Sequence, residues 1–173
     1  METIYHVAAS LDGYIADTDH GVHWLEKLNI DQKQTGMEEF FASIDGLIMG
    51  RKTFDFVHEY GSWPYGDLPT WVCSNREVPE MDGCNLQAEN DLEAAIESAK
   101  SRSLKRVWVV GGGQIAARLI ELKRLSLVSV SLMPVLLGSG IKLVDNLPGA
   151  IFLRQVASRS IGGFSQIEYE LDP

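Results

Sequence analysis

Short, unbroken apolar runs recur along the whole chain, and they constrain its fold more than any other feature. They lie at residues 4–9, 47–49, 71–73, 107–110, 127–137 and 167–171. Several are continuous rather than alternating in polarity, which is typical of strands that are covered on both faces. Stretches with helical periodicity lie between them, so the sequence predicts an α/β sheet.

The clearest helical stretch covers residues 91–100. Its apolar positions recur three and four residues apart, as one face of a helix requires; they are Leu92, Ala95, Ile96 and Ala99. Asn90 with Glu93 is interpreted as the pair that caps the first turn. Further helices are predicted over residues 37–43 and 52–58 and from Gln114 onward.

The end of the chain shows a different pattern. Residues 152–160 and 165–171 are strand-like and are joined by Gly162-Gly163. Two strands joined by a glycine turn are typical of an antiparallel hairpin. The predicted fold is therefore a mixed, mostly parallel central sheet flanked by helices, with a C-terminal antiparallel hairpin.

Length and charge bound the class of protein. A chain of 173 residues that is 45% hydrophobic can bury one substantial core, so a single domain over residues 1–173 is predicted. The formal net charge of −9 opposes the approach of a polyanion, which argues against nucleic acid and membranes as partners. Cys73 and Cys84 lack CxxC spacing, and no leader or apolar span is evident, so a cytoplasmic location is expected.

One turn combines a glycine with two cations. The apolar strand at 47–49 ends at Gly50, and Arg51, Lys52 and Thr53 then open a predicted helix. Unpaired N–H groups and the helix dipole favour an anion at such a helix start, and the two cations add to that field. The turn is interpreted as a phosphate site, with a solvated basic pair as the alternative.

A second turn carries three glycines. The strand at 107–110 is followed by Gly111, Gly112 and Gly113, and a helix is predicted to follow. Glycines let backbone N–H groups approach a diphosphate closely. With Ala116 the spacing satisfies the loose Gly-x-Gly-x-x-Gly/Ala pattern. No acidic ribose partner follows about 20 residues on, which disfavours an ordinary Rossmann enzyme and leaves a turn without a ligand as the alternative.

The loop after the first strand is the third candidate segment. Small residues end the strand, and Asp12-Gly13 turns the chain before it resumes an apolar course at Ile15. Small residues at a strand end let a flat ligand approach, and the loop can close over it. A plain Asp-Gly turn is the alternative.

Taken in order, these segments resemble the dihydrofolate reductase superfamily, and most closely its branch that is similar to the riboflavin-pathway reductase C-terminal domain. The resemblance rests on four motifs, at residues 10–13, 49–53, 111–113 and 134–140. It implies NADPH as the cofactor. The implied cofactor-binding residues are Ala9 and Ile15 at the nicotinamide, Gly50, Arg51, Lys52 and Thr53 at the adenosine-side phosphates, Ser74, Asn75 and Arg76 at the 2′-phosphate and adenine, and Gly111, Gly112, Gly113, Gln114 and Ile115 at the diphosphate.

The resemblance also implies a reaction, and this chain departs from the family pattern at one position. The reaction is hydride transfer to an imine or carbonyl of a small heterocyclic or sugar-linked substrate, similar to 5-amino-6-(5-phosphoribosylamino)uracil. Asp12 is the expected catalytic residue, relaying a proton, with an ordered water as the alternative. Dihydrofolate reductases carry an acid where this chain has Gln34, with Glu38 and Glu39 about one turn further on.

Two other functions therefore stay open. One is a true dihydrofolate reductase that uses Glu38 or Glu39 in place of the missing acid. The other is a non-catalytic NADP(H)-binding protein. The resemblance, with the apolar run at 127–137 and the C-terminal hairpin as a sheet edge, further implies a homodimer. The loop residues Asp17, Asp19, His20 and His23 lack a helical scaffold, so no metal site is predicted.

Overall fold

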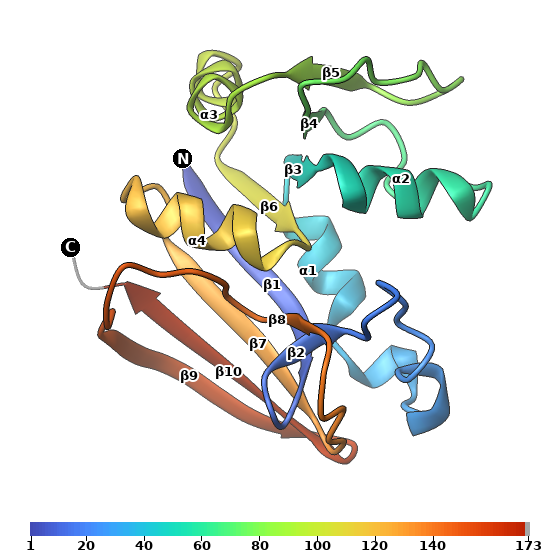
Figure 1. The fold of residues 1–173 in the computed structure, drawn as a ribbon, viewed down its shortest axis with the longest axis vertical. Coiled ribbons are helices and arrows are strands. Elements are labelled where there is room, and N and C mark those ends of the chain that lie inside the picture. Colours follow the sequence, from blue (N-terminus) through green and yellow to red (C-terminus); the bar gives the residue numbers. More distant parts are fainter. Residues whose placement is uncertain (172–173) are drawn as a thin grey trace.

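The computed structural model describes residues 1–171 and shows a central sheet with helices on both faces (Figure 1). The sheet has eight strands in the order β5-β4-β3-β6-β1-β7-β10-β9. The strands are β1 (Glu2–Ser10), β3 (Gly46–Gly50), β4 (Thr70–Cys73), β5 (Leu86–Glu89), β6 (Arg106–Val110), β7 (Leu127–Met133), β9 (Leu153–Ile161) and β10 (Phe164–Leu171). β2 (Tyr14–Ala16) and β8 (Ile141–Lys142) form a separate two-stranded ribbon.

The direction of the strands agrees with the predicted mixed sheet. All pairs from β5 across to β7 are parallel, whereas β10 pairs antiparallel with β7 and with β9. The hairpin β9–β10 is the predicted C-terminal one, and it closes through Gly162 and Gly163, both of which have positive φ. The predicted fold class is thus confirmed.

Four α-helices cover the sheet, two on each face. The helices are α1 (Met37–Ser43), α2 (Arg51–Glu59), α3 (Leu92–Ser101) and α4 (Gly113–Glu121), and short 3-10 turns lie at Glu26–Leu28 and Gln32–Gln34. The apolar faces of α3 and α4 pack on one side of the sheet, against residues such as Tyr5, Ile48 and Val107. α1 and α2 cover the other side, where Phe54 packs with Leu47 and Met49. None of the helices in the described part of the chain is long and apolar enough to cross a membrane.

Several predicted boundaries were wrong for local reasons. The run at 127–137 stops being a strand at Met133, because Pro134 has no N–H to donate and Val135 turns back to bond the Met133 carbonyl. The cap of α3 is Asp91, which accepts from Ala94 N, rather than Asn90. α4 begins one residue early, at Gly113. The short strands β5, β2 and β8 were not predicted: β5 mixes apolar with polar residues, and β2 and β8 have only three and two residues.

β9 is an edge strand with little cover. Eight of its nine residues, from Leu153 to Ser160, are exposed, and Ile151 and Phe152 just before it are exposed as well. A long exposed edge with apolar side chains is a template for another strand. We therefore propose that the chain forms a homodimer through β9, in keeping with the expectation from its sequence.

The dimer has a direct test. Light scattering at micromolar concentration should give about 38 kDa, twice the 19.2 kDa of one chain. Val156→Lys on β9 should shift the mass toward that of one chain, whereas Leu136→Lys, at an exposed position outside the strands, should not. A parent that scatters as a single chain would contradict the proposal.

Candidate functional site

The predicted cofactor segments meet at one edge of the sheet. β4, β3, β6 and β1 are parallel neighbours, so their carboxyl ends lie side by side (Figure 1). The chain leaves these strands at Cys73, Gly50, Val110 and Ser10. The carboxyl edge of a parallel sheet is where open α/β folds bind ligands.

Two of the turns are in contact with each other. A Cβ added to Gly111 would lie 3.0 Å from Thr53 Oγ1, and one added to Gly50 would lie 3.3 Å from Cγ1 of Ile115. The start of α2 therefore lies against the β6–α4 turn, and the start of α4 lies against the β3–α2 turn. The two predicted phosphate segments are therefore neighbours in space.

Both helices start without a capping side chain. The N-cap residues are Gly50 for α2 and Gly112 for α4; neither offers a side-chain hydrogen bond, and no acidic residue lies in either first turn. The first N–H groups of a helix have no partner within the helix, and the dipole places partial positive charge there. Two such helix starts in contact make a site for an anion with more than one charged group.

The three glycines of the β6–α4 turn have different roles. Gly111 and Gly112 have φ of +66° and +75°, a conformation that L side chains rarely adopt. Gly113 is buried, and a Cβ there would overlap the carbonyl oxygen of Lys142 and lie 3.0 Å from that of Leu143. Gly113 is thus required by packing within the protein.

Arg51 and Arg76 lie close together, as their positions after successive strands predict. Arg51 Nε contacts Asp55 Oδ1 at 2.6 Å, and Nη2 of Arg76 lies 3.4 Å from Asp55 Oδ2. Arg51 also donates to the Glu77 carbonyl. The Arg76 side chain is 69% exposed, so only its pair with Asp55 would have to open for it to turn toward a ligand.

The other residues predicted near the 2′-phosphate shape this corner of the edge. Ser74 Oγ accepts from Arg76 N at 3.0 Å and donates to the Arg76 carbonyl, which closes the turn after β4. Lys52, Asn75 and Gln114 are exposed at the same edge.

The residues predicted at the nicotinamide lie on the other side of the edge. The side chains of Ala9 and Ile15 are buried in the core beneath α3 and α4, and the half-buried Ile115 packs against the same cluster. Only the backbone of Ala9 can therefore reach the edge. Asp12 is exposed, and its carboxylate accepts from the Ser10 hydroxyl and from two backbone amides.

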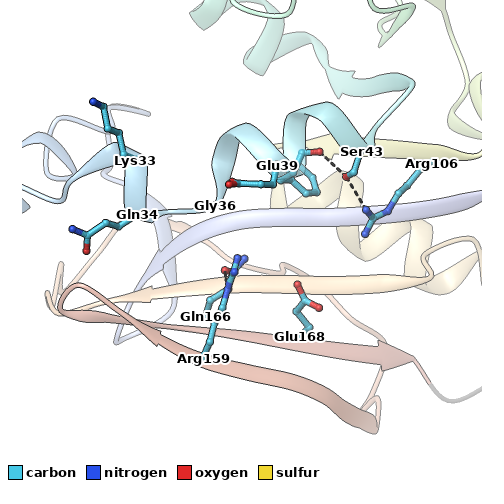
Figure 2. Close-up of a pocket in the computed structure, with 10 residues that line it drawn as sticks. Lys33, Gln34, Gly36, Glu39, Ser43, Arg106, Arg159, Gln166 and Glu168 are labelled. Carbon is cyan, nitrogen blue, oxygen red and sulfur yellow. Dashed lines mark hydrogen bonds between the residues drawn. The ribbon is translucent and has the colours of Figure 1, made fainter.

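A polar cavity of about 460 Å³ lies between α1 and the C-terminal hairpin (Figure 2). Glu39 and Ser43 of α1 face it from one side, and Arg159, Gln166 and Glu168 of β9 and β10 face it from the other. Arg106 closes one end, where it donates to Ser43 Oγ and pairs with Glu2. Among the described residues, Arg159, Glu39 and Glu168 take part in no ion pair.

A hydrogen-bonded network forms one wall of this cavity. Arg159 Nε donates to Gln166 Oε1 at 2.7 Å, and Gln166 Nε2 donates to Ser129 Oγ at 3.2 Å. Ser129 also lies 3.0 Å from His6 Nδ1 and 3.4 Å from Glu168 Oε1. The strand register explains these contacts, because His6, Ser129 and Glu168 occupy matching positions on β1, β7 and β10.

His6 is held neutral in this network. Burial, followed by the positive charges of Arg159 and Arg106, lowers the pKa of His6 to about 4. The ring also stacks on Phe40, with 4.1 Å between the ring centroids. A neutral histidine can accept or donate one hydrogen bond without adding charge.

The residues that line this cavity include the position where dihydrofolate reductases carry an acid. Gln34 lines it, but in a short 3-10 turn rather than on α1, and its amide bonds Asp31. Of the two acids further on, Glu39 lines the cavity and Glu38 does not. Glu168 supplies a second carboxylate that sequence reasoning missed. The available signal was the spacing of Gln166 and Glu168 in a predicted strand, because residues two apart share a face.

The loop acids and histidines form no ligand cluster. No group of three or more metal-ligating side chains was found in residues 1–171. Asp17 instead accepts from the amides of Asp19 and Gly21, which closes a local turn.

Comparison with known proteins identifies the family. The family model of the RibD C-terminal domain matches residues 2–163. The chain belongs to the RibD C-terminal domain family. It is 25% identical to the Bacillus subtilis protein YwjB, described as uncharacterized, over 97% of both chains. Its fold is therefore that of a reductase family with a dihydrofolate-reductase-like sheet, as the four motifs predict.

Two solved structures extend the comparison. A Shewanella sp. PV-4 protein, provisionally named as a riboflavin biosynthesis protein, is 28% identical and superposes with a TM-score of 0.85 over all of both chains. The Thermotoga maritima deaminase/5-amino-6-(5-phosphoribosylamino)uracil reductase is 14% identical, with a TM-score of 0.75 over 99% of this chain and 56% of that one. At that identity the second likeness shows the fold alone.

Proposed function

We propose that this RibD-type chain is an NADPH-dependent reductase. One observation carries the proposal: two uncapped helix starts, at Gly50 and Gly112, touch each other and lie beside a pair of arginines. On a chain of net charge −9, such a concentration of positive potential is local and calls for a ligand with several negative charges.

The residues at the edge fit the cofactor. The amides at the start of α2 and the side chains of Lys52 and Thr53 would hold the adenosine-side phosphates, and the amides of Gly112 to Ile115 would hold the diphosphate. Arg51 and Arg76, with Ser74 and Asn75, would bind the 2′-phosphate. The loop from Ala9 to Ile15 would lie along the nicotinamide. When bound, NADPH supplies the hydride for the reduction.

For the substrate we propose an imine or carbonyl of a small heterocycle, or of a sugar-linked one similar to 5-amino-6-(5-phosphoribosylamino)uracil. The family and the name of the Thermotoga protein support this class. The polar cavity supports it too, because Glu39, Glu168 and Arg159 offer acceptors and donors that a nitrogen heterocycle can use. The hydride goes to the electrophilic carbon, and a proton goes to the nitrogen or oxygen bonded to it.

We propose that an ordered water, rather than Asp12, donates that proton. Hydrogen bonds from the Ser10 hydroxyl and from the amides of Gly138 and Leu137 lower the pKa of the Asp12 carboxyl. A carboxylate that is ionised at neutral pH and already accepts three hydrogen bonds has no proton to give. The chain's role is then to align the reactants and exclude bulk water.

Two alternatives keep specific support. Glu39 lines the polar cavity, so a true dihydrofolate reductase would use that carboxylate as its displaced acid. A non-catalytic NADP(H)-binding protein would use only the carboxyl edge of the sheet, where the phosphates are proposed to bind. We expect consumption of NADPH with the deaminated riboflavin-pathway intermediate and little or none with dihydrofolate, followed as loss of absorbance at the NADPH band.

The test of the cofactor uses both nicotinamide dinucleotides. We expect NADPH to bind the parent, and Arg51→Ala or Arg76→Ala to weaken it by roughly 10- to 100-fold, because each loses a charge-assisted phosphate contact. NADH lacks that phosphate, so its affinity should be nearly the same for the parent and for both variants. Arg118→Ala, at the far end of α4, is the matched control. Equal losses for NADPH and NADH would show that these arginines do not bind the 2′-phosphate.

A further inference from the structure

Asp12 makes contacts that join distant parts of the chain. Its Oδ1 accepts from Ser10 Oγ at 2.6 Å and from Leu137 N at 3.1 Å, and its Oδ2 accepts from Gly138 N at 2.7 Å. Leu137 and Gly138 are 125 and 126 residues further along the sequence. An exposed carboxylate with both oxygens engaged in this way is a fixed bridge rather than a free acid.

The segment held by this bridge, residues 137–145, is here called the strap. It runs from Asp12 along the loop at residues 10–16: β8 pairs with β2, Leu143 N donates to the Gly13 carbonyl at 2.8 Å, and Gly140 packs against the Ala16 carbonyl so closely that no Cβ would fit. Its middle is tied to the core, because the Tyr5 hydroxyl donates to the Leu143 carbonyl at 2.9 Å.

The other end of the strap reaches the start of α4. The carbonyl oxygens of Lys142 and Leu143 face the Cα of Gly113, and Asp145 N approaches the Gly113 carbonyl at 3.4 Å. One short segment thus contacts both the loop proposed for the nicotinamide and the helix start proposed for the diphosphate.

We propose that Asp12 is a positioning residue that anchors the strap. The strap then fixes the loop at residues 10–16 relative to the start of α4, so that both ends of the cofactor can bind together. This role rests on the proposed cofactor site, because it concerns how that site is assembled. It differs from proton relay in what it predicts, since a relay acts only during turnover whereas an anchor acts on the protein before any substrate is present.

The test compares Asp12→Ala and Asp12→Asn with Asp17→Asn. Asp17 is a matched control: its Oδ1 also accepts two backbone amides, from Asp19 at 2.9 Å and Gly21 at 2.7 Å, but both lie in its own turn. NADPH affinity is measured without substrate, and amide hydrogen exchange is followed along the strap and the first turn of α4. The pH profile of turnover is recorded for each variant.

With Asp12→Ala we expect a 10- to 100-fold weaker NADPH affinity, faster exchange at Leu137 and Gly138 and at the start of α4, and an unchanged shape of the pH profile. Asp12→Asn should fall between parent and Asp12→Ala, because the amide keeps one accepting oxygen. Asp17→Asn should match the parent in all three measurements.

Other outcomes overturn the proposal. Faster exchange confined to Leu137 and Gly138, with unchanged NADPH affinity, would reduce the bridge to a local turn. Unchanged affinity and exchange with a turnover that falls more steeply as pH rises would make Asp12 a proton relay. If the parent itself fails to bind NADPH, the proposed function fails, and the exchange at the start of α4 in the apo protein still decides whether Asp12 is coupled to it.

Discussion

Gly113→Ala should cost the protein about 2 to 4 kcal/mol of unfolding free energy and most of its NADPH affinity. The added methyl group would overlap the Lys142 carbonyl oxygen, and because Gly113 is buried, the backbone of the strap or the start of α4 must move. Overpacking of this kind typically costs about 1 to 3 kcal/mol, and more where the neighbour is backbone, which cannot rotate away. Urea or thermal unfolding measures the loss, and calorimetric titration with NADPH measures the affinity.

Gly149→Ala is the control for Gly113→Ala. Gly149 has nothing within 4 Å of the added Cβ, and its φ lies outside the positive range, so its stability should change by less than about 0.5 kcal/mol. A Gly113→Ala protein as stable as Gly149→Ala would mean that the strap does not pack on α4 as described.

His6 should make the parent lose stability as pH falls from about 6.5 to about 4. Its pKa is about 4 in the folded chain and 6.5 ordinarily, so in this window the unfolded chain binds the proton more readily than the folded one. The stabilisation is complete above pH 6.5 and lost as pH falls. Because His6 is only partly buried, we expect roughly 2 to 3 kcal/mol from this one group, less than the full value of the pKa shift.

The measurement is urea unfolding at a series of pH values for the parent and for His6→Gln, which cannot titrate. The variant should lose less stability than the parent between pH 6.5 and pH 4, although other acidic groups keep some slope in both. His23→Gln, an exposed histidine beside Glu26, is the control and should keep the parent's slope. Identical slopes in all three proteins would rule out the lowered pKa of His6.

The alternation of strands and helices, and the meeting of the glycine turns, could be predicted from sequence for a simple physical reason. Parallel strands place all their carboxyl ends at one edge, so segments that follow adjacent strands are neighbours. That argument locates Arg51 near Arg76 without knowing any distance. It does require the two strands to be adjacent in the sheet, as β3 and β4 are.

The polar cavity and the contacts of Asp12 needed the structure. Ser129 and Ser131 stand two apart in a buried strand, as Gln166 and Glu168 do in another, so a polar face was visible in both. Which of these residues meet depends on the register between β7 and β10, and no local pattern sets that register. In the same way, nothing near Asp12 indicates that its partners come from residues 137 and 138.

The position of β1 sets the order in which the chain can fold. β1 is the first strand made, yet its neighbours on both sides are β6 and β7, more than 100 residues later. During synthesis β1 has no strand partner until about residue 110 has left the ribosome, and it gains its second partner only after about residue 133. We therefore expect slow, high-contact-order folding, and N-terminal fragments that end before β7 should collapse without forming the central sheet.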